Sequence, residues 1–353
     1  MESSSTTGAA RTDGAASGGS STATRGNPAR RPRWKQPLAT GVAAALLILL
    51  PLLLTPFHQD LATRIVILAL LAMSLDLIYG YAGMISLGHA AFFGAGGYTV
   101  GMLMVDGGVT NFWVGMAVSV LVASVVAAIV GFVALRTRGI YFILVTFAMG
   151  QMIYSLAQQW DVLQTSGAEA VVGIAPPEVS PLVIQWTSLN MYYFTLVVAG
   201  VAALVLYLLV SSRYGLVLRG IRENQQRMSA LGYNTWLYQY SAFIAAGAIA
   251  GVAGVLFAYY SGIMAPANVG IAQSGLIVLM IIIGGVGRLW GGVIGAVVVE
   301  LAGFLADQYA PDHKNLVLGA LFVVALVVLR AIAITGKKRA SRRRSEEGAH
   351  VHA

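Results

Sequence analysis

Long apolar runs recur along most of the chain, and they constrain its fold more than any other feature. A transmembrane helix needs about 20 mostly apolar residues to cross the hydrocarbon core of a bilayer. Soluble domains carry roughly 25% charged residues, whereas this chain of 353 residues has only 10% charged and 58% hydrophobic residues. We therefore predict an all-α polytopic membrane protein of about ten transmembrane helices, and not a soluble domain or a nucleic-acid binder. The ten runs are residues 38–57, 61–79, 84–105, 112–135, 139–159, 191–210, 238–260, 273–287, 290–306 and 315–334.

Two polar tails flank the apolar part of the chain. Residues 1–36 are rich in Ser, Thr, Ala and Gly and end in a basic cluster, and residues 336–353 are also basic. The first tail cannot bury enough apolar surface to fold, so we predict that it is disordered. A signal peptide is the alternative, but the run 38–57 is too long for a signal core and no small-residue cleavage site follows it. The predicted organisation is a cytoplasmic tail over 1–36, a membrane domain over 37–335 and a second cytoplasmic tail over 336–353.

The basic residues predict how the runs cross the membrane. If the N-terminus is cytoplasmic and all ten runs cross, then Arg64 and Lys314 are the only Lys or Arg residues, out of 22, at outer ends. Cytoplasmic loops of membrane proteins carry an excess of Lys and Arg, so this sorting predicts that both termini are cytoplasmic. The third, eighth and ninth runs are rich in glycine and are candidates for broken or re-entrant helices, which persist at membrane depth only inside protein or along a cavity.

The sequence lacks the motifs of several kinds of catalytic and binding site. The chain has no cysteine, no phosphate-binding loop of the GxxxxGK[ST] type, no HExxH motif and no GxSxG nucleophile elbow. Its five histidines are scattered. We therefore expect no catalytic residues, no metal site, no ATPase site and no cofactor bound by this chain.

The inner loop over residues 211–237 is the most informative polar segment. From Leu216 to Leu231 the pattern predicts a single short amphipathic helix, with i,i+4 ion pairs from Glu223 to Arg219 and to Arg227. Gly232 then supplies a helix stop. The residues alone leave two interpretations open: a helix on the membrane surface, with its arginines on anionic headgroups, or a docking helix for a cytoplasmic partner.

Polar groups and glycines within the predicted spans are candidates for a translocation path. Ionisable residues inside a membrane are costly and mark functional sites by default, although groups near helix ends can reach water. The glycines have close helix packing as their alternative role, and on that basis Gly285→Leu is expected to block helix approach. A glutamine can also bond to a neighbouring helix without any substrate. The candidates are Asp76, Gly83, His89, Gln151, Gly284, Gly285 and Glu300.

Four ordered stretches resemble a known family. They are LDLIYGYAGMISLGHAAFFGAGGYTVGM (75–102), RGIYFILVTFAMGQMIYSLAQQWDVL (138–163), GLVLRGIRENQQRMSALGYNTWLYQYSAFIAAGAIAGVAGVL (215–256) and MIIIGGVGRLWGGVIGA (280–296). Together they resemble the permease subunits of ABC importers for branched-chain amino acids, and most closely the longer of that system's two permeases. The resemblance runs over roughly residues 61–310. One departure is TSGAEAVVGI at Thr165–Ile174, where the family commonly has a GGxDG-like turn.

The resemblance implies a machine of several subunits in the plasma membrane. This chain would pair with a second permease, two cytoplasmic ATP-binding subunits would power the pore, and an extracytoplasmic binding protein would deliver the solute. The mechanism implied is ATP-driven alternating access, for branched-chain amino acids or for urea, short amides or aromatic acids. The alternative is a secondary transporter or channel driven by an ion gradient, which would need a buried relay such as Asp76 with Glu300. The implied ATPase-coupling segment contains Arg219, Arg222, Glu223, Asn224, Arg227, Ala230, Leu231 and Gly232.

Overall fold

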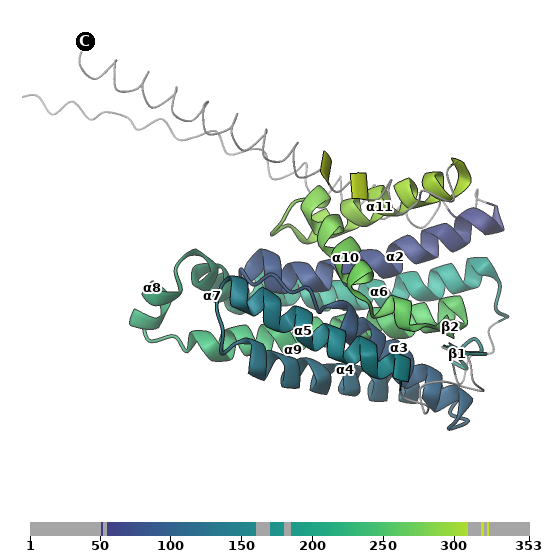
Figure 1. Cartoon of the computed structure of the whole chain (residues 1–353). Helices are drawn as coiled ribbons and strands as arrows, with labels where there is room; N and C mark the ends of the chain where they lie inside the picture. The colour runs from purple at the N-terminus through teal and green to yellow at the C-terminus, as the bar shows by residue number, and fades with distance from the viewer. Residues whose placement is uncertain are drawn as a thin grey trace, which may run out of the picture. The chain divides into compact units, whose positions relative to one another are not determined.

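The computed structural model describes residues 51, 55–159, 170–179, 185–309, 319–320 and 323–324. The tails 1–36 and 336–353 lie outside these residues, as do most of the runs 38–57 and 315–334. In chain order the elements are α2 (Pro56–Asp76), the π-helical turn η1 (Leu77–Tyr81), α3 (Ala90–Val105), α4 (Phe112–Ala134), α5 (Ile140–Gln159), β1 (Val171–Val172), α6 (Ser188–Ser211), α7 (Arg213–Glu223), α8 (Gln225–Ala230), α9 (Thr235–Ser261), β2 (Ile263–Met264), the 3₁₀ turn η4 (Pro266–Asn268), α10 (Ile271–Gly284) and α11 (Leu289–Tyr309) (Figure 1).

The described chain is mainly helical, as predicted, and seven helical segments are long and apolar enough to cross a membrane. They are Pro56–Tyr81, Phe112–Ala134, Ile140–Gln159, Ser188–Ser211, Thr235–Ser261, Pro266–Gly284 and Leu289–Tyr309. The third predicted run forms a shorter apolar helix, α3, of 16 residues. The second to ninth runs of the sequence thus each contain a helix, with ends that differ by a few residues from those predicted.

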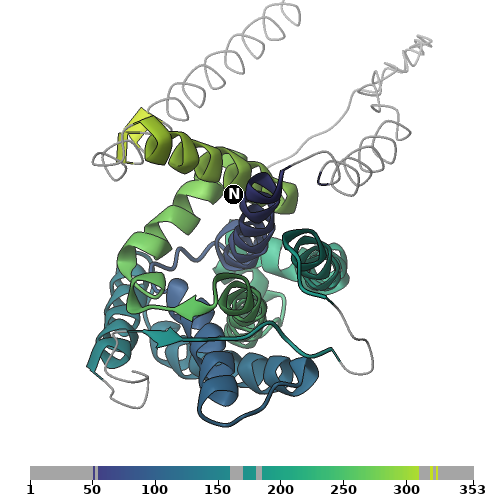
Figure 2. The same cartoon turned by 90° about the vertical axis from the view of Figure 1, so that its right-hand side faces the viewer.

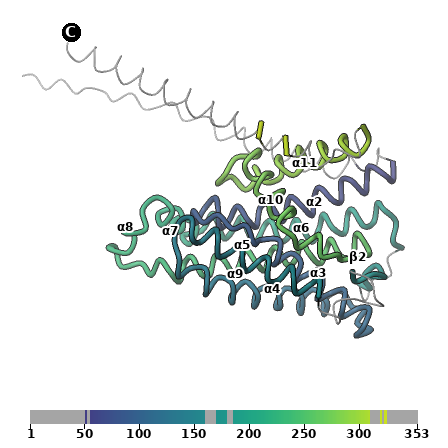
Figure 3. The backbone as a smooth tube through the Cα atoms, in the orientation of Figure 1, coloured from purple at the N-terminus to yellow at the C-terminus, as the bar shows by residue number. Residues whose placement is uncertain are grey.

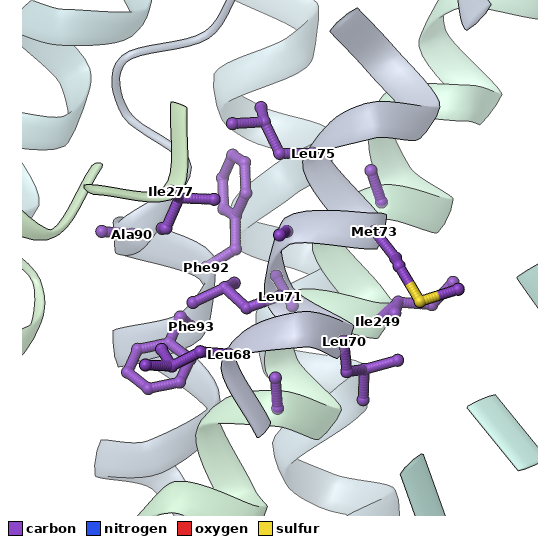
Figure 4. Close-up of a cluster of buried hydrophobic side chains, with 14 of the residues drawn as sticks. Leu68, Leu70, Leu71, Met73, Leu75, Ala90, Phe92, Phe93, Ile249 and Ile277 are labelled. Atoms are coloured by element: carbon purple, nitrogen blue, oxygen red, sulfur yellow. The ribbon is translucent and has the colours of Figure 1, made fainter. Parts of the chain in front are cut away.

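Helices α2, α3 and α9 form the centre of the bundle. The rings of Phe92 and Phe93 on α3 lie 5.4 and 5.3 Å from two phenylalanine rings of α9. Phe92, Phe93 and the residues Leu68 and Leu71 of α2 are all fully or almost fully buried (Figure 4). On the α9 side, a Cβ on Gly254 would lie 1.9 Å from the carbonyl oxygen of Phe93. Only glycine allows backbones to approach so closely, which is the usual device of helix packing in membranes. Helices α4, α5 and α6 have fewer buried residues than α2 and α9.

The third run is broken, as the sequence suggested, whereas the ninth run, residues 290–306, lies within the single continuous helix α11 and is not broken. The π-helical turn η1 ends α2, residues 82–89 leave helical geometry, and α3 begins only at Ala90, six residues after the predicted start (Figure 3). The eighth and ninth runs form α10 and α11, which are separated at residues 285–288. Gly285 and Gly287 have φ values of +97° and +80° there, and glycine alone adopts such values without strain.

The two ends of the bundle carry different elements. Helices α7 and α8 lie at one end, and the antiparallel pair β1–β2, with Val171 opposite Met264, lies at the other (Figures 1 and 2). These two-residue strands, with an isolated β-bridge between Asn111 and Glu178, are departures from an all-α fold. Because α7 and α8 contain the basic inner loop of the sequence, the β1–β2 end corresponds to its predicted outer side.

Candidate functional site

The basic segment after α6 folds as two helices, and the predicted single helix over Leu216–Leu231 is wrong. Helix α7 ends at Glu223 because Asn224 adopts extended angles, with φ −158° and ψ 99°. The Asn224 side chain then accepts a hydrogen bond from the main-chain N–H of Arg227 at 2.9 Å and caps α8. Asparagine is among the strongest N-cap residues, so a local hydrogen bond outweighs the continuous amphipathic pattern.

The helix stop at Gly232 is confirmed. Gly232 has φ +88°, its N–H donates to the carbonyl of Ser229 at 3.0 Å, and the N–H of Tyr233 donates to Met228 at 3.2 Å. This pair of bonds is the Schellman arrangement, which satisfies the last carbonyls of a helix. Ala230 is therefore the last residue of α8, and the exposed Leu231 follows it.

The predicted ion pairs of Glu223 with Arg219 and Arg227 do not form within the described residues. Arg219 instead donates from Nη2 to the carbonyl of Val210 at 3.2 Å, and its guanidinium lies 5.2 Å from the ring centre of Tyr81. An intrahelical pair is worth only about 0.2–0.5 kcal/mol, so contacts with the membrane helices determine where this arginine lies. Glu223 and Arg227 remain exposed.

Arg222 connects α7 to the break between α2 and α3. Its Nη1 donates a hydrogen bond to the main-chain carbonyl of Gly80 in η1. The stem of the same side chain passes close to Gly83, where a Cβ would lie 2.9 Å from the Arg222 Cγ. Gly83 also has φ +77°, so both backbone conformation and space require glycine there. Gly83, a candidate for the translocation path, thus lies against the predicted coupling segment.

The loop between α10 and α11 meets the same place. The N–H of Gly287 donates to Oδ1 of Asp76, the last residue of α2, at 2.8 Å. A Cβ on Gly80 would lie 2.1 Å from that carboxylate oxygen and 2.5 Å from the Gly287 nitrogen. We call Asp76, Gly80, Gly83, Arg222 and Gly287 the Arg222 junction. It joins three elements that are distant in sequence: the end of α2, helix α7 and the α10–α11 loop.

Asp76 is fully buried in the Arg222 junction. Its Oδ2 has no hydrogen-bond partner among the described residues, while the positive charge of Arg222 is near enough to interact with it. Burying a carboxylate is costly unless a charge and hydrogen bonds compensate it. The Gly287 N–H and the Arg222 guanidinium supply that compensation, so the acid and the arginine depend on each other.

The glycines after α10 have two different roles. A Cβ on Gly284 would lie 1.7 Å from the carbonyl oxygen of Gly291, so the start of α11 packs directly on the end of α10. At Gly285 nothing lies within 4 Å of a built Cβ, but φ is +97°. The expectation that Gly285→Leu blocks the approach of another helix is therefore wrong. A side chain at Gly285 would instead strain the backbone, because its φ value favours glycine.

His89 is buried where α3 begins, between α2 and α10. The Ser74 hydroxyl donates to the carbonyl of Leu71 at 2.7 Å, so His89 Nε2–H donates to the Ser74 oxygen at 2.8 Å. On the α10 side, the N–H of Ala90 donates to the hydroxyl of Ser274 at 3.2 Å. The His89 Nδ1 atom has no hydrogen-bond partner among the described residues. His89 thus connects the broken end of the third run to α2, and the Ala90 N–H connects it to α10.

Two further candidates lie away from the Arg222 junction. Gln151 is partly exposed on α5, next to Gly150, whose Cβ position would lie 2.9 Å from the Gly88 Cα. Glu300 of α11 forms an ion pair with Arg64 of α2, with 3.0 Å between Oε2 and Nε. Twelve residues of helix separate Arg64 from Asp76, which corresponds to about 18 Å. Asp76 and Glu300 therefore form no shared relay.

Sequence reasoning placed Arg64 at an outer helix end and gave it no partner. The only signal that could have predicted this ion pair was the presence of an arginine and a glutamate within two different apolar runs, because charges in a membrane tend to pair with each other.

The structure also shows a cavity of about 410 Å³ beside the Arg222 junction, lined by residues that include Gly83, Arg222 and Trp236.

Comparison with known proteins identifies the family. Residues 58–326, more than half of the chain, match the family of the branched-chain amino acid transport system permease component. The chain is 24% identical over 315 residues to the high-affinity branched-chain amino acid transport system permease protein LivM of Escherichia coli K12, covering 83% of this chain and 73% of that protein. It is 27% identical over 279 residues to the corresponding LivH protein of Salmonella typhimurium, covering 74% and 89%.

A nucleoside ABC transporter permease protein, NupC of Lactococcus lactis, matches over 58 residues only, at 38% identity, which covers 16% of this chain and 18% of that protein. No solved structure matches the chain significantly. The match to the family spans the described helices, with their seven membrane-crossing segments, and includes the Arg222 junction. The chain therefore belongs to the permease component family of branched-chain amino acid transport systems and is a multi-pass protein of the inner membrane.

Proposed function

We propose that this chain is one of two permeases in an ATP-binding-cassette importer that takes up branched-chain amino acids. The family and the printed names of the LivM and LivH relatives support this substrate class. Related small polar solutes such as urea, amides and aromatic acids are the alternatives within the same class of machine. The chain matches both LivM and LivH, which supports a pore built from two related permeases.

The other proposed partners follow from this class of transporter. Two cytoplasmic ATP-binding subunits hydrolyse ATP, and an extracytoplasmic binding protein delivers the solute. We assign no ATPase site, metal or cofactor to this chain, and no nucleic acid. Membrane lipid surrounds the exposed faces that the second permease leaves uncovered.

Ten spans with both termini in the cytoplasm remain the proposed topology. Eight of the ten predicted runs contain a described helix, and runs 38–57 and 315–334 would supply the other two. The position of α7 supports the orientation, because its three exposed or half-exposed arginines lie at the end of the bundle that the positive-inside rule assigns to the cytoplasm.

The contact of Arg222 with Gly80 is the observation that carries the mechanism. Glu223, Arg227 and Leu231 are exposed on or next to α7 and α8, where an ATP-binding subunit would dock. Arg222 binds in the opposite direction, to the π-helical turn that ends α2. Single π-helical turns occur frequently at functional sites. A displacement of α7 would therefore move the end of α2 and, through Asp76 and Gly287, the α10–α11 loop.

A displacement of α7 can produce alternating access only if the ATP-binding subunits contact α7 and α8 differently with and without bound ATP. The two breaks at residues 82–89 and 285–288 allow the helix ends to move while the buried centre around Phe92 and Leu71 stays packed. In this mechanism the candidates Gly83, Gly284 and Gly285 act as hinge positions beside the path. His89, Gln151 and Glu300 are the polar candidates that lie at other depths of the bundle.

Reconstitution of the transporter in liposomes tests the proposed function. The chain is combined with the second permease, the ATP-binding subunits and the binding protein from its own host, and uptake of radiolabelled leucine is measured. We expect uptake that requires ATP and every subunit. Accumulation of leucine by this chain alone, driven by a proton or sodium gradient, would establish the secondary transporter instead. The same preparation without ATP is the matched control.

A further inference from the structure

A second cavity among the described residues lies far from the Arg222 junction. It measures about 730 Å³ and lies between the first two turns of α2, the end of α9, helix α10 and the second half of α11. Sites for small molecules usually measure about 300–1,000 Å³, so a free amino acid fits this volume. Because the cavity lies at the end of the bundle opposite α7, it faces the outer side in the proposed topology.

A guanidinium is partly available in this cavity. Arg64 uses its Nε for the ion pair with Glu300. Its terminal nitrogens Nη1 and Nη2 have no hydrogen-bond partner among the described residues, and 43% of the side chain is exposed. Glu300, in contrast, is only 9% exposed, so the buried acid fixes one edge of the guanidinium. The other edge presents parallel N–H donors, the geometry that binds a carboxylate with two hydrogen bonds.

Acidic and apolar groups complete the lining. Asp60 lies one helical turn before Arg64 and lines the same cavity. The Tyr260 hydroxyl is near enough to Asp60, Arg64 and Glu300 to interact with all three charges. Leu276, Val299 and Phe304 form an apolar wall beside them. The cavity therefore combines a site for an anion, a site for a cation and an aliphatic surface.

From this arrangement we infer that the Arg64 cavity is an outer binding site for an α-amino acid with an aliphatic side chain. The inference rests on the proposed function for its substrate class. The ligand carboxylate binds the Nη edge of Arg64, the ammonium group lies at Asp60, and the side chain packs on Leu276, Val299 and Phe304. A zwitterion is the ligand that uses both charges, whereas urea, amides and simple acids use one or none.

The lack of cysteine in the chain allows a direct test by labelling. Gln308 lines the cavity and is exposed, so a Gln308→Cys variant of the assembled transporter, held in lipid nanodiscs without ATP, is treated with a polar maleimide. We expect leucine to slow the labelling. Isoamylamine and 4-methylpentanoate, which each lack one of the two charges, should protect only at concentrations about tenfold higher or more, since each forgoes a charged hydrogen bond.

Two controls make the result specific. Asp106→Cys places an exposed thiol at the end of α3, at the same end of the bundle but outside the cavity, and leucine should not change its labelling. Arg64→Lys keeps a positive charge beside Glu300 but removes the forked edge. In the Gln308→Cys background it should raise the leucine concentration needed for protection about tenfold or more, while protection by isoamylamine, which has no carboxylate for Arg64 to bind, should stay as before.

The outcomes separate this inference from the proposed function. If leucine is taken up with ATP but never slows labelling of Gln308→Cys, the cavity is no binding site. If leucine protects the Arg64→Lys variant equally well, Arg64 does not bind the ligand carboxylate. Either result overturns the inference and leaves the permease role standing. If the complete transporter takes up another solute and not leucine, the proposed substrate is wrong, and the inference fails with it.

Discussion

The Arg222 guanidinium on α7 donates a hydrogen bond to the main-chain carbonyl of Gly80, 142 residues earlier in the sequence. This contact joins an exposed segment, which the proposed topology places in the cytoplasm, to the place where α2 loses α-helical geometry. Because Gly80 also touches Asp76 and Gly287, the contact extends to the loop between α10 and α11. A docking event on α7 and α8 is thereby connected to two helix breaks through the hydrogen bonds of Arg222 with Gly80 and of Gly287 with Asp76.

A Gly80→Ala substitution should destabilise the permease. The added Cβ would lie 2.1 Å from Asp76 Oδ1 and 2.5 Å from the Gly287 nitrogen, so the Asp76–Gly287 bond has to lengthen. We expect a loss of about 1–3 kcal/mol, typical of overpacking in a well-packed interior, measured as a lower midpoint of thermal unfolding in detergent. Gly200→Ala is the matched control, because nothing lies within 4 Å of its built Cβ. Equal midpoints for the two variants would contradict the close packing at Gly80.

A Ser74→Ala substitution should destabilise the break before α3. It removes the oxygen that accepts from the buried His89 Nε2–H, and an unsatisfied buried donor costs about 1–3 kcal/mol. Ser124→Ala removes a hydroxyl that bonds only to the carbonyl of Val120 in its own helix, at 2.6 Å, and should be nearly neutral. Thermal unfolding of both variants in the same detergent gives the comparison. A Ser124 variant that loses as much stability as the Ser74 variant would show that His89 is not held in this way.

The sequence predicted the features that depend on one segment of the chain, and it missed those that depend on contacts between distant segments. Eight helices were predicted from apolar runs, since hydropathy is a property of each segment alone. The helix break at Asn224 was missed because the amphipathic pattern continues through it, although an asparagine three residues before the Arg227 N–H is a local cap signal. The glycines of the broken runs indicated where helices end but not what they contact.

Contacts between distant segments were beyond the sequence. Nothing near Arg222 indicates Gly80 as its partner, and nothing near Arg64 indicates Glu300, because both pairs exist only once the helices are packed. Local rules instead predicted pairs within one helix, of Glu223 with Arg219 and Arg227. Those pairs are weak, and Arg219 instead donates to the main-chain carbonyl of Val210 at the end of α6, while Arg227 stays exposed.

An Asn224→Ala substitution should weaken docking of the ATP-binding subunits. Loss of an N-cap costs about 0.5–2 kcal/mol of helix stability, and α8 has only six residues, so we expect it to unfold locally. Asn224→Ser retains a capping oxygen and should dock normally. Affinity of the purified ATP-binding subunits for the permease pair is the measurement. Normal affinity of the alanine variant would show that α8 takes no part in docking.

Glu223→Lys should affect docking and not folding. Glu223 is exposed and forms no ion pair within the described residues, and surface substitutions of this kind usually change stability by less than about 0.5 kcal/mol. We expect normal membrane insertion, an unchanged unfolding midpoint and reduced recovery of ATP-binding subunits on co-purification. Asp106→Lys reverses an exposed charge at the opposite end of the bundle and should leave recovery unchanged. Full recovery with Glu223→Lys would place the docking surface elsewhere.

The amount of leucine taken up per ATP hydrolysed tests the role of Arg222 most directly. The complete transporter is reconstituted with Arg222→Gln, which shortens the donor side chain and removes its charge, or with Arg227→Gln, which changes an exposed arginine on α8 that forms no ion pair with a described residue. We predict that Arg222→Gln assembles and hydrolyses ATP but moves little leucine, whereas Arg227→Gln keeps its transport per ATP. Wild-type transport per ATP in the Arg222→Gln variant would contradict the proposed coupling through the Arg222 junction.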